Sequence, residues 1–431
     1  MDQQTYLAKA EKYFAGGTLG AFHLPPDVAM VFASAQGTKM VDSDGKEYID
    51  FLMGSGPMIL GHCHPAVVEA VQEQTRKGTT YFTLNQPIIE LAEKIVEAAP
   101  CGEKIRFVTT GSEAVSYAVR MARAFTGRSK ILRFEGGWHG VSDGLLFGAR
   151  PPQPSDYPHA TPDSAGLPSA YGRDVLVSPF NAAGEAAEII EAYADDLAAV
   201  VVEPLQRCIL PRPGFFETLR AQTRKHGVIL IFDEVVTGFR MAWGGAQERY
   251  GVVPDLATYG KTISGGYPSA AICGRADLLD TASPRRAPYP ADPQSIIASG
   301  TFNGNPLAAA AGLATINELA KPGTYERLFA MGDRITREIE AMGREFSIPL
   351  KVGGEGPVLQ VLFTTDDAII NYESMLYADR TKAYTFGVEM IRRGFFVSPF
   401  EKIYLSMAHS DDDLDRMLEA ARDVLRNVMW G

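Results

Sequence analysis

The feature that most limits the possible folds is an alternation of short apolar runs with amphipathic segments of helical period. The runs are rich in β-branched residues and bounded by turn residues, as is typical of strands buried on both faces of a sheet. They lie at residues 105–108, 130–134, 198–202 and 228–232. Segments 113–125 and 214–226 between them place apolar residues on one helical face. This repetition predicts an α/β fold with a mostly parallel sheet.

The two ends of the chain predict a second, smaller lobe. From about residue 310, long helical patterns surround a strand-like segment at 395–399, which indicates an α+β domain. Residues 39–41 and 47–51 flank a turn at 42–45, as in a β-hairpin, and we expect this N-terminal segment to join the lobe. The predicted parts are an N-terminal segment, a large domain and a small domain. Their bounds are 1–65, 66–309 and 310–431.

Residues 150–172 interrupt the alternation and are rich in Pro, Ser, Ala and Gly. A loop of this length inside a compact domain is usually either disordered or a functional lid. Both alternatives remain open from the sequence.

Composition excludes several classes of partner. The net charge of −11 argues against nucleic acid or an anionic membrane, because phosphate groups are bound by basic surfaces. Residues 1–13 show no secretory signal, and no apolar run is long enough to span a bilayer. Four well-separated cysteines without a C-x-x-C pair predict neither a disulfide framework nor a zinc site. We therefore expect a cytoplasmic protein.

Two residues near the ends of predicted strands could carry chemistry. Asp233 follows 228–232, at the strand end where open α/β sheets bind ligands, and its carboxylate could hold a positively charged heterocycle or simply cap a loop. Lys261 lies among small and apolar residues, and burial would favour the neutral, nucleophilic form of its amine. A lone lysine is more commonly a solvated surface charge. A P-loop is disfavoured, because the Walker pattern needs glycine where Asp255 stands.

Glycine-rich segments after two other strands suggest ligand contacts. Gly111 and Ser112 open the helix predicted after 105–108, and their N–H groups with the Ser112 hydroxyl could bind a phosphate or form a plain helix cap. Trp138, in a glycine-rich turn, could stack on a flat ring or belong to the core. His62 and His64 lack further ligands nearby in the sequence, so we predict no metal site.

Taken together, the order and spacing of these motifs resemble a known family. The segments concerned are 111–114, 138–140, 203–204, 233–240, 260–261 and 300–306. They resemble the class III aminotransferases of pyridoxal-phosphate (PLP) fold type I. Segments 56–62, 161–168 and 398–409 resemble the glutamate-1-semialdehyde aminomutase subgroup, in which the second is a mobile lid. The resemblance implies a large PLP-binding domain with a mostly parallel, seven-stranded type of sheet and a smaller α+β domain.

The resemblance also implies roles for individual residues around PLP. Lys261 would form a Schiff base with the cofactor and move a proton between substrate and cofactor carbons. Asp233 would bind the protonated pyridine nitrogen and keep the ring an electron sink. The other implied contacts are to the phosphate (Gly111, Ser112, Thr301), the ring faces (Trp138, Val235) and the ring edge (His139, Glu203).

Further implications concern assembly and substrate. Thr301 would act from the neighbouring subunit, which implies a homodimer. Glu401 would lie near the substrate amine. His23 and Gly20 stand where the subgroup has a carboxylate-binding arginine and a serine, and Ser55 replaces its active-site tryptophan. Loss of such an arginine removes a contact worth about 1.5–3 kcal/mol. We therefore expect a bulkier or carboxylate-free amine substrate rather than glutamate-1-semialdehyde.

Three functions follow, in order of preference. The first is an aminotransferase that moves an amino group from an amine or amino-acid donor to a keto acid or aldehyde in two half-reactions. The second is an isomerase, either an aminomutase or an amino-acid racemase, which needs no second substrate. The third is a non-catalytic binding protein of the same fold, which the presence of Lys261 and Asp233 disfavours. Arg240, Arg392 and Arg393 are possible binders of a substrate carboxylate.

Overall fold

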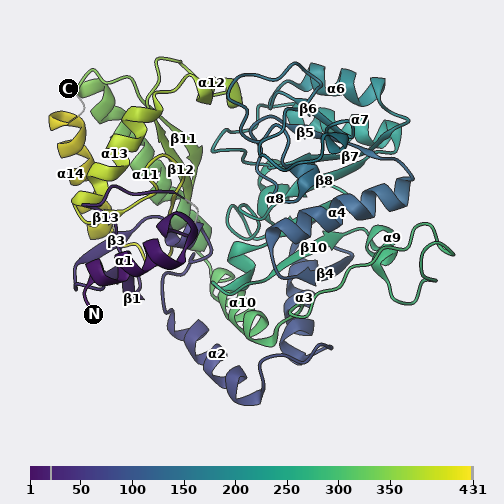
Figure 1. The fold of residues 1–431 in the computed structure, drawn as a ribbon, viewed down its shortest axis with the longest axis horizontal. Coiled ribbons are helices and arrows are strands. Elements are labelled where there is room, and N and C mark those ends of the chain that lie inside the picture. The colour runs from purple at the N-terminus through teal and green to yellow at the C-terminus, as the bar shows by residue number, and fades with distance from the viewer. Residues whose placement is uncertain (20–21, 429–431) are drawn as a thin grey trace. The chain divides into compact units, whose positions relative to one another are not determined.

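In a computed structural model the chain forms two compact units (Figure 1), and the structure describes residues 1–19 and 22–428. Unit 1 comprises Met1–Pro65, Gly323–Ala368 and Tyr377–Gly431. Unit 2 comprises Ala66–Pro322 and Ile369–Leu376. The functional domains predicted from the sequence remain a prediction, because compactness alone does not define them.

Unit 2 is built on a seven-stranded sheet of order β4-β10-β9-β8-β7-β5-β6. β10 runs antiparallel to its neighbours β4 and β9, and the other neighbouring pairs are parallel. The predicted α/β fold with a mostly parallel sheet is therefore confirmed. The strands are β4 (Lys104–Val108), β5 (Lys130–Phe134), β6 (Val175–Ser178), β7 (Leu197–Val202), β8 (Ile229–Asp233), β9 (Leu256–Tyr259) and β10 (Ala270–Gly274).

The four strands predicted from apolar runs correspond to β4, β5, β7 and β8, with ends that agree within one residue. The prediction did not include β6, β9 and β10. β6 and β9 have only four residues, and β9 and β10 contain alanine, which has a weak preference for strands. Their pairing with neighbouring strands compensates for the weak local signal.

Helices cover both faces of this sheet, which explains why its strands are apolar at consecutive positions. α4 (Gly111–Thr126) packs against Val201 and Ile231, whereas α7 (Phe215–His226) packs with Val200 and Leu230. Adjacent strand residues point to opposite faces, so each strand serves two cores. Figure 1 shows α4 apart from α6 (Ala183–Ala192) and α7. α4 and α7 confirm the two predicted helices.

The remaining helices of unit 2 include one that packs closely behind Lys261. A Cβ added to Gly312 of α10 would lie only 2.1 Å from the Ile263 carbonyl oxygen in the 3₁₀ turn η4 (Lys261–Ser264). Glycine therefore allows this close approach. The other helices are α2 (Pro65–Lys77, shared with unit 1), α3 (Gln86–Ala98), α5 (Ser169–Gly172), α8 (Gly245–Tyr250), α9 (Ala276–Leu279), α10 (Pro306–Leu319) and α12 (Tyr372–Leu376), with 3₁₀ turns η3 (Asp143–Leu145) and η5 (Asp280–Ala282).

The proline-rich loop at 150–172 is attached to the carboxyl end of β5. The buried Glu135 carboxylate accepts hydrogen bonds from Ser155 N at 2.7 Å and from the Tyr157 hydroxyl at 2.5 Å. Burial, with the adjacent Glu135, raises the pKa of Tyr157. Asp163 accepts from Ala149 N and Arg150 N at 2.8 and 2.7 Å. The loop thus follows a defined path, and its role as a lid stays a prediction.

Unit 1 contains a four-stranded sheet of order β1-β2-β3-β13 and a three-stranded sheet of order β11-β12-β14. The predicted hairpin is present as β2 and β3. The strand expected at 395–399 is only two residues long, as β13, and pairs parallel with β3. The strands are β1 (Phe32–Gln36), β2 (Lys39–Asp42), β3 (Glu47–Asp50), β11 (Lys351–Glu355), β12 (Val358–Leu362), β13 (Phe395–Phe396) and β14 (Ile403–Tyr404).

The helices of unit 1 come from both ends of the chain. They are α1 (Gln3–Tyr13), α11 (Thr324–Glu345), α13 (Arg380–Arg392) and α14 (Asp411–Asn427), with 3₁₀ turns η1 (Ala15–Gly17) and η2 (Met53–Ser55). Within residues 1–19 and 22–428, we find no helix with the length and apolar character needed to cross a bilayer.

Candidate active site

Asp233 forms the centre of a hydrogen-bonded cluster at the carboxyl end of β8. Its side chain is 5% exposed, and Oδ2 lies 2.8 Å from His139 Nδ1. Oδ1 accepts from Thr258 Oγ1 at 3.1 Å and from Val235 N at 3.2 Å. A carboxylate has about four lone-pair sites, so these three contacts leave capacity for one more N–H donor.

Lys261 follows β9 and begins η4, and its backbone is in the left-handed region with φ of +44°. A non-glycine residue adopts this region at an energetic cost, which is often found at functional sites. A Cβ on the preceding Gly260 would lie 3.2 Å from Val235 Cγ1, and one on Gly111 would lie 3.1 Å from the same methyl carbon. Val235 therefore lies between the Lys261 segment and the beginning of α4.

The beginning of α4 has the features of an anion site. Thr110 and Glu113 form a capping box, but the N–H groups of Gly111 and Ser112 have no hydrogen-bond acceptor within the described residues. Ser112 Oγ accepts from Val141 N at 3.3 Å. Two available N–H donors at the N-terminus of a 16-residue helix attract a negatively charged group.

Trp138 lies at the surface next to this cluster, not in the core. Its side chain is 38% exposed, and its N–H donates to Glu203 Oε2 at 2.8 Å. The Arg150 guanidinium carbon lies 5.1 Å from the centre of the Trp138 ring, within the range of a cation–π contact. The alternative of a core tryptophan is therefore excluded, and the role of Trp138 at the cofactor ring stays a prediction.

Most of the residues expected to contact the cofactor thus lie in unit 2, around Asp233 and the beginning of α4. Thr301, by contrast, is exposed in a loop. In the same loop, Asn303 Oδ1 accepts from Thr109 Oγ1 at 3.2 Å. A single chain does not test a contact from a neighbouring subunit, so the expected role of Thr301 stays a prediction.

The residues expected to contact substrate belong to unit 1. His23 and Ser55 are exposed, and Ser55 has a positive φ of 65° at the end of η2. Glu401 is half-buried. Their substrate roles stay predictions, and Gly20 lies outside the described residues.

Two residues of the cluster were missed by sequence reasoning. Thr258 is the register partner of Asp233 across β8 and β9, and Gln206 is completely buried beside the turn that holds His139. Strand pairing could have identified Thr258, had β9 been predicted, whereas Gln206 has no local signal. Arg240 is also fully buried and donates to Thr262 Oγ1 at 3.0 Å, so it supports the Lys261 turn from inside the protein.

The other two arginines considered as carboxylate binders are engaged within unit 1. Arg392 Nε donates to Asp27 Oδ2 and Arg393 Nε donates to Asp423 Oδ2, both at 2.8 Å. These ion pairs give both arginines a structural role.

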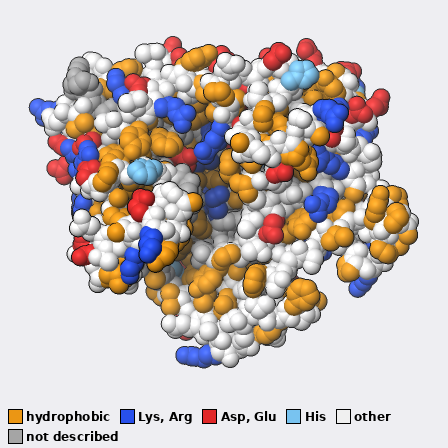
Figure 2. Space-filling view, viewed as in Figure 1, with side chains coloured by type: hydrophobic (Ala, Val, Ile, Leu, Met, Phe, Trp, Pro, Cys, Tyr) orange, Lys and Arg blue, Asp and Glu red, His pale blue; other side chains and the backbone are white. Residues whose placement is uncertain are grey.

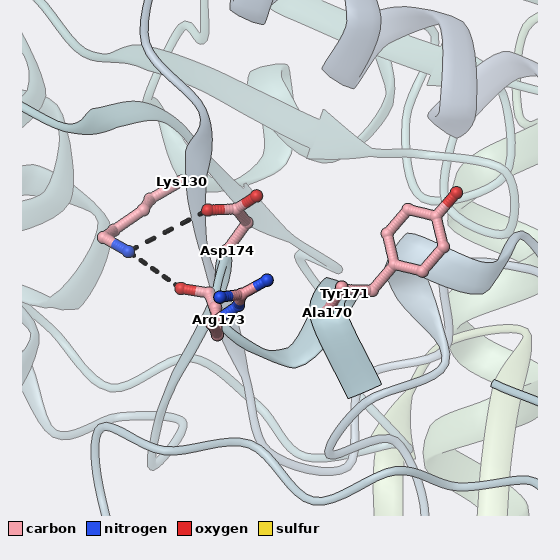
Figure 3. A pocket seen from close by; sticks show the side chains of 5 residues that line it. All are labelled: Lys130, Ala170, Tyr171, Arg173 and Asp174. Atoms are coloured by element: carbon pink, nitrogen blue, oxygen red, sulfur yellow. Dashed lines mark hydrogen bonds and ion pairs between the residues drawn. The ribbon is translucent and has the colours of Figure 1, made fainter. Parts of the chain in front are cut away.

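Figure 3 shows the residues that line a separate cavity of about 470 Å³. Its lining residues are Lys130, Ala170, Tyr171, Arg173 and Asp174. Lys130 is the first residue of β5, and Asp174 directly precedes β6, so the cavity lies at the amino ends of these strands. It is distinct from the Asp233 cluster. Elsewhere in the described chain, no three His, Cys, Asp or Glu side chains are grouped as a metal site would require.

Comparison with known proteins agrees with this geometry. The family model for aminotransferase class-III matches residues 24–420. The glutamate-1-semialdehyde 2,1-aminomutase 2 of Brevibacillus brevis is 38% identical over 430 residues, covering 98% of this chain and 97% of that protein. The glutamate-1-semialdehyde 2,1-aminomutase of Methanothermobacter thermautotrophicus is 40% identical over 433 residues, covering 99% and 100%. An omega-transaminase from Sphaerobacter thermophilus superposes with a TM-score of 0.90 at 30% identity, covering 99% and 97%.

These findings correct the expected reaction. The first choice from the sequence, a two-half-reaction aminotransferase for a substrate other than glutamate-1-semialdehyde, is contradicted by relatives named as aminomutases that match nearly the whole chain. That choice depended on His23 and Ser55, two positions in a chain of 431 residues. Side chains at two positions do not define the reaction, because the lysine and the cofactor can serve both chemistries. The isomerase alternative is favoured.

Proposed function

Because this chain belongs to the class-III aminotransferase family of PLP enzymes, we propose that it is a PLP-dependent aminomutase. The proposed reaction moves the amino group of glutamate-1-semialdehyde from C2 to C1 and the carbonyl in the opposite direction, giving 5-aminolevulinate. The observation that carries this proposal is the 38–40% identity, over nearly the whole chain, to proteins named for that reaction. The cofactor is pyridoxal 5′-phosphate.

The residues of unit 2 fit this cofactor. Gly111 and Ser112 offer two N–H groups without acceptors for its phosphate. Asp233 has capacity for the pyridine N–H, and Trp138 presents an exposed aromatic plane. Lys261 supplies the amine that reacts with an aldehyde. We assign residues 66–309 as the PLP-binding domain and 310–431 with 1–65 as the small domain.

When bound, PLP supplies an electron sink that stabilises negative charge on a substrate carbon. In the proposed mechanism, Lys261 Nζ would hold the cofactor and would then move a proton between substrate and cofactor carbons. Asp233 Oδ1 and Oδ2, oriented by Thr258 and His139, keep a proton on the pyridine nitrogen. Val235 and Trp138 orient the ring. Amine and carbonyl exchange within one molecule, so the site needs no second substrate.

We also propose roles toward the substrate for three residues. Glu401 is assigned to the substrate amine, and His23 and Ser55 are assigned to the walls of the substrate site. His23 in place of arginine leaves the recognition of the substrate carboxylate to other groups.

We further propose a homodimer, with Thr301 reaching the phosphate of the neighbouring subunit. Its loop lies beside an apolar surface in which Phe82, Leu84 and Phe302 are 73%, 77% and 57% exposed. A hydrogen bond of 2.9 Å from Asn85 Nδ2 to the Gly304 oxygen joins these two segments. Figure 2 shows hydrophobic side chains at the surface over α3 and α10. Exposed apolar areas of this kind mark protein interfaces.

The proposed compartment remains the cytoplasm. None of the four cysteines, Cys63, Cys101, Cys208 and Cys273, forms a disulfide, as is usual in a reducing compartment.

The proposed function is tested with purified, PLP-loaded protein and glutamate-1-semialdehyde as the sole substrate. We expect 5-aminolevulinate to accumulate without any added keto acid. The control is Lys261→Ala, which should form no product and should retain no covalently attached PLP after borohydride reduction and mass spectrometry. A reaction that requires a keto-acid acceptor and consumes it stoichiometrically would refute the aminomutase.

A further inference from the structure

Two buried polar atoms near Asp233 have no partner. His139 is 1% exposed and Gln206 is 0% exposed. Neither His139 Nε2 nor Gln206 Oε1 has a hydrogen-bond partner among the described residues. Buried polar groups in native proteins are almost always satisfied by protein or by ordered water, so the pair calls for an explanation.

Both atoms border the same glycine. A Cβ added to Gly137 would lie 3.0 Å from Gln206 Oε1 and 3.2 Å from His139 Nε2. The Phe134 carbonyl oxygen lies 3.1 Å from the same point. The missing side chain of Gly137 therefore keeps open a small region lined by polar atoms.

The orientations of both side chains are set by their other ends. Gln206 Nε2 donates to the Glu135 carbonyl oxygen at 2.6 Å, so a reversed amide would place two oxygens together. His139 Nδ1 lies 2.8 Å from Asp233 Oδ2. A carboxylate accepts hydrogen bonds, so the ring hydrogen belongs on Nδ1 and leaves Nε2 with a lone pair.

Two acceptors, Nε2 and Oε1, then face one region, and neither can satisfy the other. A single molecule with two donor hydrogens satisfies both. We propose that one buried water donates to His139 Nε2 and to Gln206 Oε1, and that Gln206 is thereby a positioning residue for His139 and Asp233. Buried waters characteristically bridge polar groups that would otherwise lack partners.

The consequence concerns the cofactor, and it rests on the proposed role of Asp233 at the pyridine nitrogen. The water holds the His139 ring at Nε2, and the ring in turn holds the direction of the Asp233 carboxylate through Nδ1. Groups that orient a primary ligand commonly change affinity by about 10- to 100-fold when they are removed, as is known for the outer shell of metal sites. Gln206 should therefore affect PLP binding without touching PLP.

The test uses a double-mutant cycle on the full-length protein. Gly137→Ala fills the water position, and Gln206→Leu removes one of the two acceptors. Each should raise the dissociation constant for PLP about tenfold. The double variant should be no weaker than either single variant, because both remove the same water. The control is Gly184→Ala in α6, where an added Cβ meets nothing within 4 Å, and which should leave PLP affinity unchanged.

Two measurements on the wild-type protein keep the inference testable even if a variant fails to fold. A high-resolution crystal structure of the PLP complex should show a water between the two side chains. Nitrogen NMR of His139 should show hydrogen on Nδ1 and an accepting Nε2. Additive losses in the cycle, an absent water, or hydrogen on Nε2 alone would each overturn the inference.

Failure of the inference can be told apart from failure of the proposed function. If the protein converts glutamate-1-semialdehyde but the two substitutions have additive effects on PLP affinity, the proposed water is refuted and the proposed aminomutase activity stands. If the two substitutions have non-additive effects on PLP affinity but the protein does not convert this substrate, the proposed water stands and the proposed aminomutase activity is refuted.

Discussion

Asp233 is oriented by two residues that are distant in the chain and by one that directly follows it. His139 follows β5, Thr258 lies on β9 and Val235 follows Asp233 itself. A carboxylate that is only 5% exposed needs such donors, because burying a charge without partners is very costly. The same donors restrict the direction in which the remaining lone pair points, and this prepares the residue to accept one more N–H group.

Asp233→Asn is expected to weaken PLP binding, because the amide keeps the size of the side chain but removes its charge. Hydrogen bonds to charged groups are worth about 1.5–3 kcal/mol, which corresponds to a loss of roughly 10- to 150-fold in affinity. Fluorescence titration with PLP measures the change. Asp174→Asn, at the opposite edge of the sheet, is the matched control and should bind PLP normally. Equal affinity of Asp233→Asn and wild type would contradict the assignment of Asp233.

At the scale of elements, hydrogen bonds join a short segment of unit 1 at 403–409 to the residues at and after the end of β3. Tyr404 N donates to the Phe51 oxygen at 2.8 Å, and Met407 N donates to the Ile59 oxygen at 2.7 Å. His409 is completely buried, and its Nε2 donates to the Asp50 oxygen at 3.0 Å while Nδ1 accepts from Ser406 N. This arrangement requires the neutral ring, and burial lowers the pKa of His409.

The lowered pKa of His409 makes the stability of unit 1 depend on pH. In the unfolded chain the ring binds a proton near pH 6.5, whereas the folded protein resists protonation until a lower pH. The unfolded state therefore binds more protons in this interval, and stability falls as the pH decreases below 6.5. Urea unfolding at several pH values measures this slope.

His409→Gln should flatten that part of the pH dependence, because the amide can donate to the Asp50 oxygen and accept from Ser406 N without titrating. The comparison of the two proteins removes contributions from other groups. Identical slopes in wild type and variant below pH 6.5 would show that His409 does not titrate there.

At the scale of the whole molecule, the proposed dimer interface is an exposed apolar surface on a chain whose net charge is −11. Leu84, Phe82 and Phe302 are each more than half exposed. Contact with water at such positions is unfavourable by about 25 cal/mol per Å² of apolar surface, so a second copy that covers them stabilises the assembly.

Leu84→Glu is expected to convert the proposed homodimer to a monomer, because each interface would then bury an unpaired carboxylate. Light scattering after size-exclusion chromatography measures the mass. The matched control is Leu19→Glu in unit 1, at a position that is 91% exposed, and it should not change the mass. A monomeric wild type, or a variant that stays dimeric, would refute this interface.

The sequence by itself determined the kinds of element and predicted several candidate site residues. Apolar runs at 130–134 and 228–232 specify strands buried on both faces, because strand and helix periods are local properties. Asp233 and Gly111 could be predicted as ligand-binding residues, since ligand-binding groups follow strands in open α/β sheets. The similarity of the motifs to a family added the cofactor, but two substituted positions misled the choice of reaction.

Only the tertiary structure decided which residues meet. Asp233, His139 and Gln206 are separated by up to 94 positions, and their contact depends on the order and register of β5, β7 and β8. The antiparallel β10, the left-handed backbone of Lys261 and the attachment of the 150–172 loop to Glu135 were likewise not predictable. Local sequence sets dihedral preferences, whereas contacts between distant segments follow from how strands pair and helices pack, and no short window of sequence contains that information.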